Sequence, residues 1–95
     1  MRLSDKQQKA IKDSFLEVFK SGSVYLFGSR VDNNLKGGDI DLYLTPNINE
    51  NLAKKRIDFL VKLKRAIGEQ KIDVVISSDT SRAIEKEAIK NGILL

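Results

Sequence analysis

The chain contains neither cysteine nor histidine, and these two absences narrow the chemistry that it can perform. Without cysteine it can form no disulfide and offers no thiolate to a metal ion. Without histidine, any general base must be a carboxylate, a lysine or a tyrosine. A metal site must therefore be built from oxygen ligands, which suit magnesium, manganese or calcium.

Long apolar runs and low-complexity segments are also missing from the sequence. No stretch approaches the run of about twenty apolar residues that a membrane-spanning helix needs. The first residues, Met1 to Lys6, hold no apolar signal core. We therefore expect a cytoplasmic protein that makes no membrane contact. A length of 95 residues predicts a single domain over residues 1–95, with one compact core.

The charge of the chain is mildly basic, since 17 lysines and arginines stand against 13 acidic residues and give a net charge of +4. A positive charge favours an anionic ligand such as a nucleotide or RNA. Most of the cationic residues, however, fall in segments that we expect to be helical, where a solvated face is the usual explanation. They also lack interleaved aromatic residues. Direct nucleic-acid binding is therefore not expected.

The apolar pattern predicts helices that alternate with short strands. The first helix runs over about residues 4–20 and opens with a capping-box pattern at Ser4 and Gln7. A second begins at Asn49 or Asn51 and ends near residue 67, and a third follows cap residues 77–80. The expected inward stripes are, in turn, Ile11, Phe15, Val18 and Phe19; Ala53, Ile57, Leu60, Val61 and Ile67; and Ile84, Ala88 and Ile89.

Strands are expected at residues 24–27, 40–44 and 72–76, where apolar and β-branched residues gather between turn residues. The order of elements predicts an α/β (α+β) fold, with a small three-stranded mixed sheet and helices packed on one side of it. The apolar tail, residues 92–95, has no place in this core. It either packs back on the sheet or meets a partner.

Three aspartates are the candidate metal ligands. Asp39 and Asp41 flank Ile40, so they project from the same face of a strand, roughly 6–7 Å apart. Two carboxylates held together without a cation repel each other, and a divalent ion removes that cost. Asp73 lies in the middle of another strand, where aspartate is uncommon. It could share the metal if its strand lies beside the strand of Asp41.

Each aspartate also has a plain structural explanation. Asp39 follows two glycines and can be a turn residue, and Asp41 can be a solvent-facing position on its strand. Asp73 can pair with Lys71 or another nearby lysine. That all three explanations are true at once is the less economical interpretation, because a glycine–serine turn stands just upstream of Asp39.

That turn is Gly28-Ser29-Arg30, which closes the strand at residues 24–27. Glycine permits close approach of the main chain to a ligand, and serine adds a hydroxyl and an N–H donor. If a helical turn follows, its N-terminus favours phosphate, and the arginine supplies a fixed positive charge nearby. A glycine–serine pair alone is most often a simple turn, so its position ten residues before Asp39 carries the argument.

The combination of Gly28-Ser29-Arg30, Gly38-Asp39-Ile40-Asp41-Leu42 and Ile72-Asp73-Val74-Val75 resembles the DNA polymerase β-like nucleotidyltransferase superfamily, and more narrowly the minimal nucleotidyltransferases. The resemblance covers nearly the whole chain. It departs from the usual pattern at Gly38, where the family often has serine, and in a short loop before Asp39.

The resemblance implies a role for each of these residues. Asp39 and Asp41 would bind two Mg²⁺ ions, and Asp73 would complete the site and help activate the attacking hydroxyl. Gly28 and Ser29 would hold the triphosphate of ATP, with Arg30 assisting. The attack would be in line on the α-phosphate, with pyrophosphate leaving.

Small members of the family resemble the antitoxin of HEPN/MNT toxin–antitoxin modules. The resemblance implies a HEPN-domain ribonuclease toxin as partner, silenced by transfer of AMP from ATP to one of its tyrosines. We expect no room for a separate acceptor domain in a chain of 95 residues. Two alternatives stay open: a non-catalytic binding module that neutralises its partner by contact, and nucleotidyl transfer to RNA or a small molecule.

Overall fold

The computed structural model describes residues 2–31 and 38–95. The elements follow in the order α1 (Asp5–Phe19), β1 (Gly22–Phe27), the 3₁₀ helix η1 (Gly28–Val31), β2 (Ile40–Pro46), α2 (Leu52–Ile67), β3 (Ile72–Ile76), α3 (Ala83–Asn91) and β4 (Ile93–Leu94). The α/β class is confirmed, and the strands and helices expected from the sequence are all present.

The sheet has four strands rather than three, in the order β3-β2-β1-β4. β1 is antiparallel to both β2 and β4, whereas β2 and β3 run parallel. The additional strand, β4, comes from the apolar tail, where Ile93 pairs with Leu26 and Leu94 with Tyr25. The tail therefore packs back on the sheet. Two residues are too few to show an alternating pattern, so the sequence did not predict a strand in this tail.

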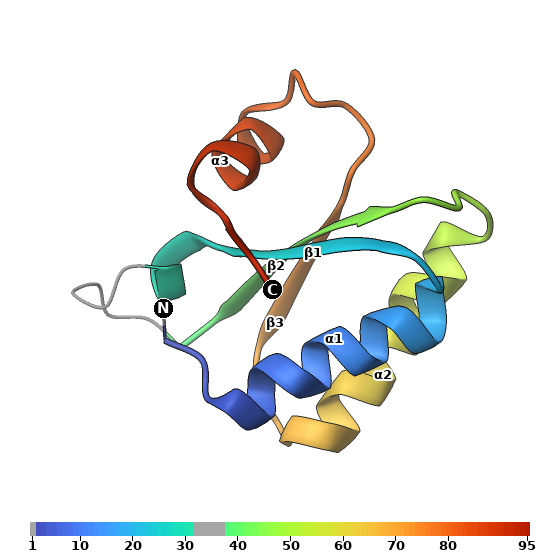
Figure 1. Cartoon of the computed structure of the whole chain (residues 1–95), viewed down its shortest axis with the longest axis vertical. Helices are drawn as coiled ribbons and strands as arrows, with labels where there is room; N and C mark the ends of the chain where they lie inside the picture. Colours follow the sequence, from blue (N-terminus) through green and yellow to red (C-terminus); the bar gives the residue numbers. More distant parts are fainter. Residues whose placement is uncertain (1, 32–37) are drawn as a thin grey trace.

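The helices do not all lie on one side of the sheet, and that expectation is wrong. α1 and α2 pack together on one face, while α3 crosses the other (Figure 1). The physical reason is that both faces of the strands carry apolar residues. Ala88 of α3 packs against Phe27 and Tyr43, which lie on the face turned away from α1 and α2.

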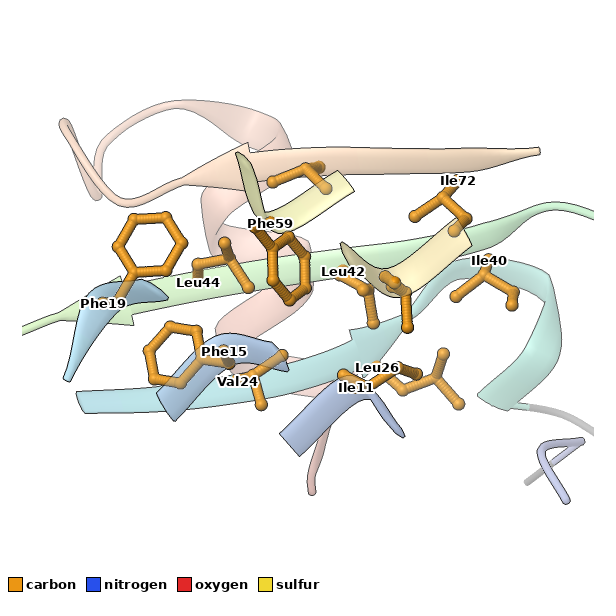
Figure 2. Packing of buried hydrophobic residues seen from close by; sticks show 12 residues of the cluster. Ile11, Phe15, Phe19, Val24, Leu26, Ile40, Leu42, Leu44, Phe59 and Ile72 are labelled. Carbon is orange, nitrogen blue, oxygen red and sulfur yellow. The ribbon is translucent and has the colours of Figure 1, made fainter. Parts of the chain in front are cut away.

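The main core lies between the sheet and the pair α1 and α2. Ile40, Leu42 and Leu44 of β2 are fully buried there and point toward the helices (Figure 2). α1 contributes the stripe expected from its sequence, with Phe15 stacked on Phe19. Since side chains alternate along a strand, Asp41 and Tyr43 must project from the opposite face.

The inward stripe of α2 was predicted only in part, since Leu60 and Ile67 pack against the main core as expected. Phe59 and Leu63 are its fully buried residues, whereas Ile57 is 60% exposed and Val61 44% exposed. α2 carries apolar residues on two stripes, and spacing alone does not say which of them meets the sheet. The aromatic ring of Phe59 packs edge-on against Phe19 of α1, within the main core.

The start of α3 also differs from the prediction, because residues 77–80 do not cap it. The helix begins at Ala83, and Arg82 at its N-cap makes no side-chain capping bond. Only Glu85 and Ala88 of this helix are buried, while Ile84 and Ile89 are exposed. The burial of Glu85, rather than of Ile84 or Ile89, requires hydrogen-bond partners for its carboxylate.

Glu85 is fully buried and accepts hydrogen bonds from the Tyr43 hydroxyl at 2.9 Å, the Ser78 N–H at 3.1 Å and the Asp79 N–H at 2.9 Å. Burial alone would raise the pKa of this carboxyl. The hydrogen bonds, together with the charge of Arg82, nevertheless hold its pKa below the usual value. The ionised Glu85 therefore ties the loop after β3 to the middle of β2.

Tyr43→Phe removes one of these donors and is expected to lower the free energy of unfolding by about 1–2 kcal/mol, because the carboxylate keeps its burial and loses a hydrogen bond. Tyr25 is the matched control, since it pairs with Tyr43 across β1 and β2 and its hydroxyl makes no hydrogen bond within the described residues. Tyr25→Phe should change stability by less than about 0.5 kcal/mol. Urea unfolding measures both, and equal losses would contradict the role given to Glu85.

Candidate active site

Two of the three candidate aspartates lie directly opposite each other on neighbouring strands. The parallel pairing of β2 and β3 aligns Asp41 with Asp73. Both residues are flanked along their strands by residues buried under α1 and α2, so both project from the other face. Asp73 is exposed and Asp41 is half-buried. The condition set by the sequence, that residues 72–76 lie beside residues 40–44, is met.

The electrostatics of Asp41 reflect this crowding. The pKa of its carboxyl is raised above the usual value of 3.8, first by burial and then by the negative charges of Asp73 and Asp39. The positive charge of Lys71 acts in the opposite direction and only partly offsets the rise. A cation placed between Asp41 and Asp73 would relieve the repulsion.

Asp39 stands just before β2 and faces a different partner. Its Oδ2 atom lies 3.3 Å from Nζ of Lys71, in an ion pair whose two side chains are 43% and 71% exposed. Within residues 2–31 and 38–95, no three acidic side chains are gathered closely enough to hold one metal ion as they stand. The structure thus brings Asp41 and Asp73 together, and it leaves Asp39 beside them but turned toward Lys71.

Gly28 sits against the Asp41 carboxylate. It has a φ of +76°, a conformation that favours glycine, and a Cβ atom added there would overlap Oδ2 of Asp41. Phe27, the preceding residue, pairs with Asp41 across β1 and β2, which explains this proximity. The glycine therefore permits both the turn out of β1 and the close approach of the carboxylate.

Ser29 and Arg30 follow in η1, so the helical turn considered from the sequence is present as a 3₁₀ helix. Ser29 is half-buried beside Gly28. The guanidinium of Arg30 donates from Nη1 to the main-chain oxygen of Arg2 at 2.7 Å and from Nη2 to that of Gly38 at 2.9 Å. Arg30 therefore holds main chain as it stands, and its assistance to a phosphate stays a prediction.

The contacts of two residues near the site were not predicted from the sequence. Lys71 was considered only as a partner of Asp73, yet it pairs with Asp39. The parallel pairing explains this, since the Ile40 N–H donates to the Lys71 carbonyl and brings the two chain segments side by side. Arg2 carried no sequence signal, because its contacts with Ser29 and Arg30 span 27 and more residues.

The donor set fits magnesium in its chemistry. Carboxylate oxygens are the ligands that this ion prefers, and Asp41 and Asp73 already lie face to face. Asp39 can join them by leaving Lys71, because an exposed ion pair contributes at most about 1 kcal/mol. Surface hollows of about 430, 450 and 530 Å³ lie elsewhere, along α1 and α2, and the three aspartates line none of them.

Gly28→Ala should reduce stability by about 1–3 kcal/mol and displace the Asp41 carboxylate, because alanine is strained at this φ and its Cβ meets Asp41. Gly38→Ala is the matched control, since a Cβ atom there meets nothing within 4 Å. Thermal unfolding of the two variants measures the difference. A Gly28→Ala protein as stable as Gly38→Ala would mean that the turn is not constrained by its neighbour.

The raised pKa of Asp41 also predicts a pH dependence. The folded state binds the proton of Asp41 more tightly than the unfolded state does. The stabilisation that this gives is fully present below pH 3.8 and is lost as pH rises through the higher pKa of the folded state. Without divalent metal, Asp41→Asn should therefore be more stable than the wild type at pH 7, by on the order of 0.5 kcal/mol after solvent screening.

This advantage should vanish near pH 3, where Asp41 is protonated in both states. Asp58→Asn, at an exposed position of α2, is the control for a changed net charge. Urea unfolding at the two pH values measures the effect, and a gain in stability independent of pH would contradict it.

The family model described as "Polymerase beta, Nucleotidyltransferase" matches residues 9–95. The matched region includes the Gly28 turn and all three aspartates. No curated protein matches the chain. In the described part of the chain, no helix has the length and apolar character needed to cross a membrane.

Proposed function

Because this chain belongs to the polymerase β-type nucleotidyltransferase family, we propose that it is a magnesium-dependent enzyme that transfers AMP from ATP to a partner protein. The observation that carries the proposal is the alignment of Asp41 with Asp73 on the face that also holds Gly28. Two adjacent carboxylates beside a glycine–serine turn, with the pKa of Asp41 raised, suit a metal–triphosphate complex better than they suit a purely structural role.

The three aspartates are the proposed metal ligands. Asp41 and Asp73 provide opposed oxygens, and Asp39 completes the set once it leaves Lys71. Bound magnesium would stabilise the charge on the transferring phosphate and favour ionisation of the attacking hydroxyl. Asp73, the most exposed of the three, is the carboxylate best placed to orient an incoming hydroxyl.

The Gly28 turn is the proposed site of the triphosphate. Gly28 has no side chain to block a ligand, and Ser29 offers a main-chain N–H and a hydroxyl as donors. The turn and Asp41 are in contact, which would keep the triphosphate and the metal ligands at a fixed separation. Such positioning supplies much of the rate enhancement of a phosphoryl-type transfer.

The acceptor is proposed to be a tyrosine of a HEPN-domain ribonuclease toxin, which the transfer of AMP would silence. Two features support an acceptor that belongs to another molecule. Asp73 is exposed, and Asp41 stays half-buried although α3 packs on Phe27, its partner in β1, and on Tyr43. A partner could therefore reach the carboxylates without any rearrangement of the described elements.

The test combines the protein with magnesium, ATP labelled on the α-phosphate and the protein encoded by the adjacent gene. We expect label on a tyrosine of that protein. Asp41→Asn and Asp73→Asn should each reduce labelling by about 100-fold or more, because each removes charge that acts at the transferring phosphate. Asp58→Asn, the same chemical change at an exposed position of α2, should leave labelling unchanged.

Two other results would replace the proposal. If no label moves and the wild type and Asp41→Asn protect equally against the partner's toxicity, the chain acts by contact alone. If labelled product forms without any protein acceptor, the substrate is RNA or a small molecule.

A further inference from the structure

Arg2 and Arg30 bind each other's segments of main chain reciprocally, and we refer to these two residues as the arginine pair. The Arg2 N–H donates to the Arg30 carbonyl at 2.7 Å, and Nη1 of Arg30 donates back to the Arg2 carbonyl at 2.7 Å. Nη2 of Arg2 also donates to the Ser29 carbonyl at 3.3 Å. The segment before α1 is thereby fixed to the turn that is proposed to hold the triphosphate.

The arginine pair also reaches the strand that carries the metal ligands. Nη2 of Arg30 donates to the carbonyl of Gly38, the residue before Asp39, and Gln70 donates to the same oxygen from the segment before β3. The turn at Ser29 and the entry to β2 are thus joined through one guanidinium. Because Arg30 depends on the Arg2 carbonyl for its other bond, a shift of Arg2 would loosen this connection.

Among the residues that the structure describes, no acidic side chain balances the positive charge of the arginine pair. Within residues 2–31 and 38–95, neither arginine forms an ion pair with a carboxylate. The Nε atoms of both arginines are buried and have no hydrogen-bond partner in the same part of the chain. Two guanidinium groups at this turn, with no counter-charge in the described part of the chain, favour an anionic ligand there.

We propose that Arg2 is a positioning residue for the triphosphate: with Arg30 it holds the Gly28–Ser29 turn at its working distance from β2, and the joint charge of the pair favours the polyphosphate of the nucleotide. The inference rests on the proposed function for its ligand. It adds a residue from outside the glycine–serine and aspartate motifs, and it gives Arg30 a role that is fulfilled through the main chain.

The experiment measures binding of inorganic triphosphate by isothermal titration calorimetry in the presence of magnesium, with no turnover required. Arg2→Gln should weaken binding about fivefold to tenfold, because a charged hydrogen-bonding group near the ligand is lost. Arg2→Lys should recover most of the loss, since lysine keeps the charge and one donor for Ser29. Arg65→Gln, an exposed arginine of α2, is the matched control and should bind as the wild type does.

A double-mutant cycle tests whether the arginine pair acts as a unit. Arg2→Gln should weaken triphosphate binding much less in the Arg30→Gln background than in the wild type, because the link between the turn and β2 is already broken there. If the losses in binding free energy of the two substitutions add, the two arginines act independently and the proposed pair is wrong. An Arg2→Gln protein that binds triphosphate as Arg65→Gln does would overturn the role of Arg2. A wild type that does not bind inorganic triphosphate would overturn the inference as well.

This inference and the proposed function can fail separately. If triphosphate binding depends on Arg2 but no AMP is transferred to any acceptor, the arginine pair stands and the proposed transferase activity fails. If transfer occurs and the KM for ATP is the same in Arg2→Gln and Arg65→Gln, the activity stands and the inference fails.

Discussion

The parallel register between β2 and β3 is the constraint on which the site depends. It places the carboxylates of Asp41 and Asp73 side by side, an arrangement that costs free energy in the absence of a cation. The register cannot slip by one residue, because Ile40, Leu42 and Leu44 would then leave the core and the aspartates would enter it. The packing of α1 and α2 on one face therefore enforces the repulsion on the other.

The face opposite α1 and α2 is divided between two kinds of carboxylate. At one end, Glu85 is buried and is held in its ionised form by donors from Tyr43 and from the loop after β3. At the other end, no such set of donors reaches Asp41 or Asp73 from the described residues, and the pKa of Asp41 is raised. The first arrangement fixes α3 on the sheet, and the second leaves a charge that a ligand can neutralise.

Positive charges near the site come from residues outside the aspartate motif. Lys71 balances Asp39 from the segment before β3, and the arginine pair lies at the Gly28–Ser29 turn. In a protein without bound metal, Lys71 reduces the mutual repulsion of the carboxylates, since its charge opposes the rise in the pKa of Asp41. The site thus has cationic groups at the Gly28–Ser29 turn and on the segment before β3.

Local sequence patterns predict the order of elements, the stripe of α1, the alternation along β2 and the glycine–serine turn, because each of these rests on local spacing or on the conformational freedom of one residue. The sequence also identified Asp39, Asp41 and Asp73 as a group through family resemblance, although it could not show which of them meet. Tertiary structure alone decided that α3 crosses the second face, that the tail forms β4, that Phe59 and Leu63 are the buried residues of α2, and that Asp39 turns to Lys71. These outcomes depend on contacts between segments far apart in the chain, and the period of an isolated segment carries no information about the surface that it will meet.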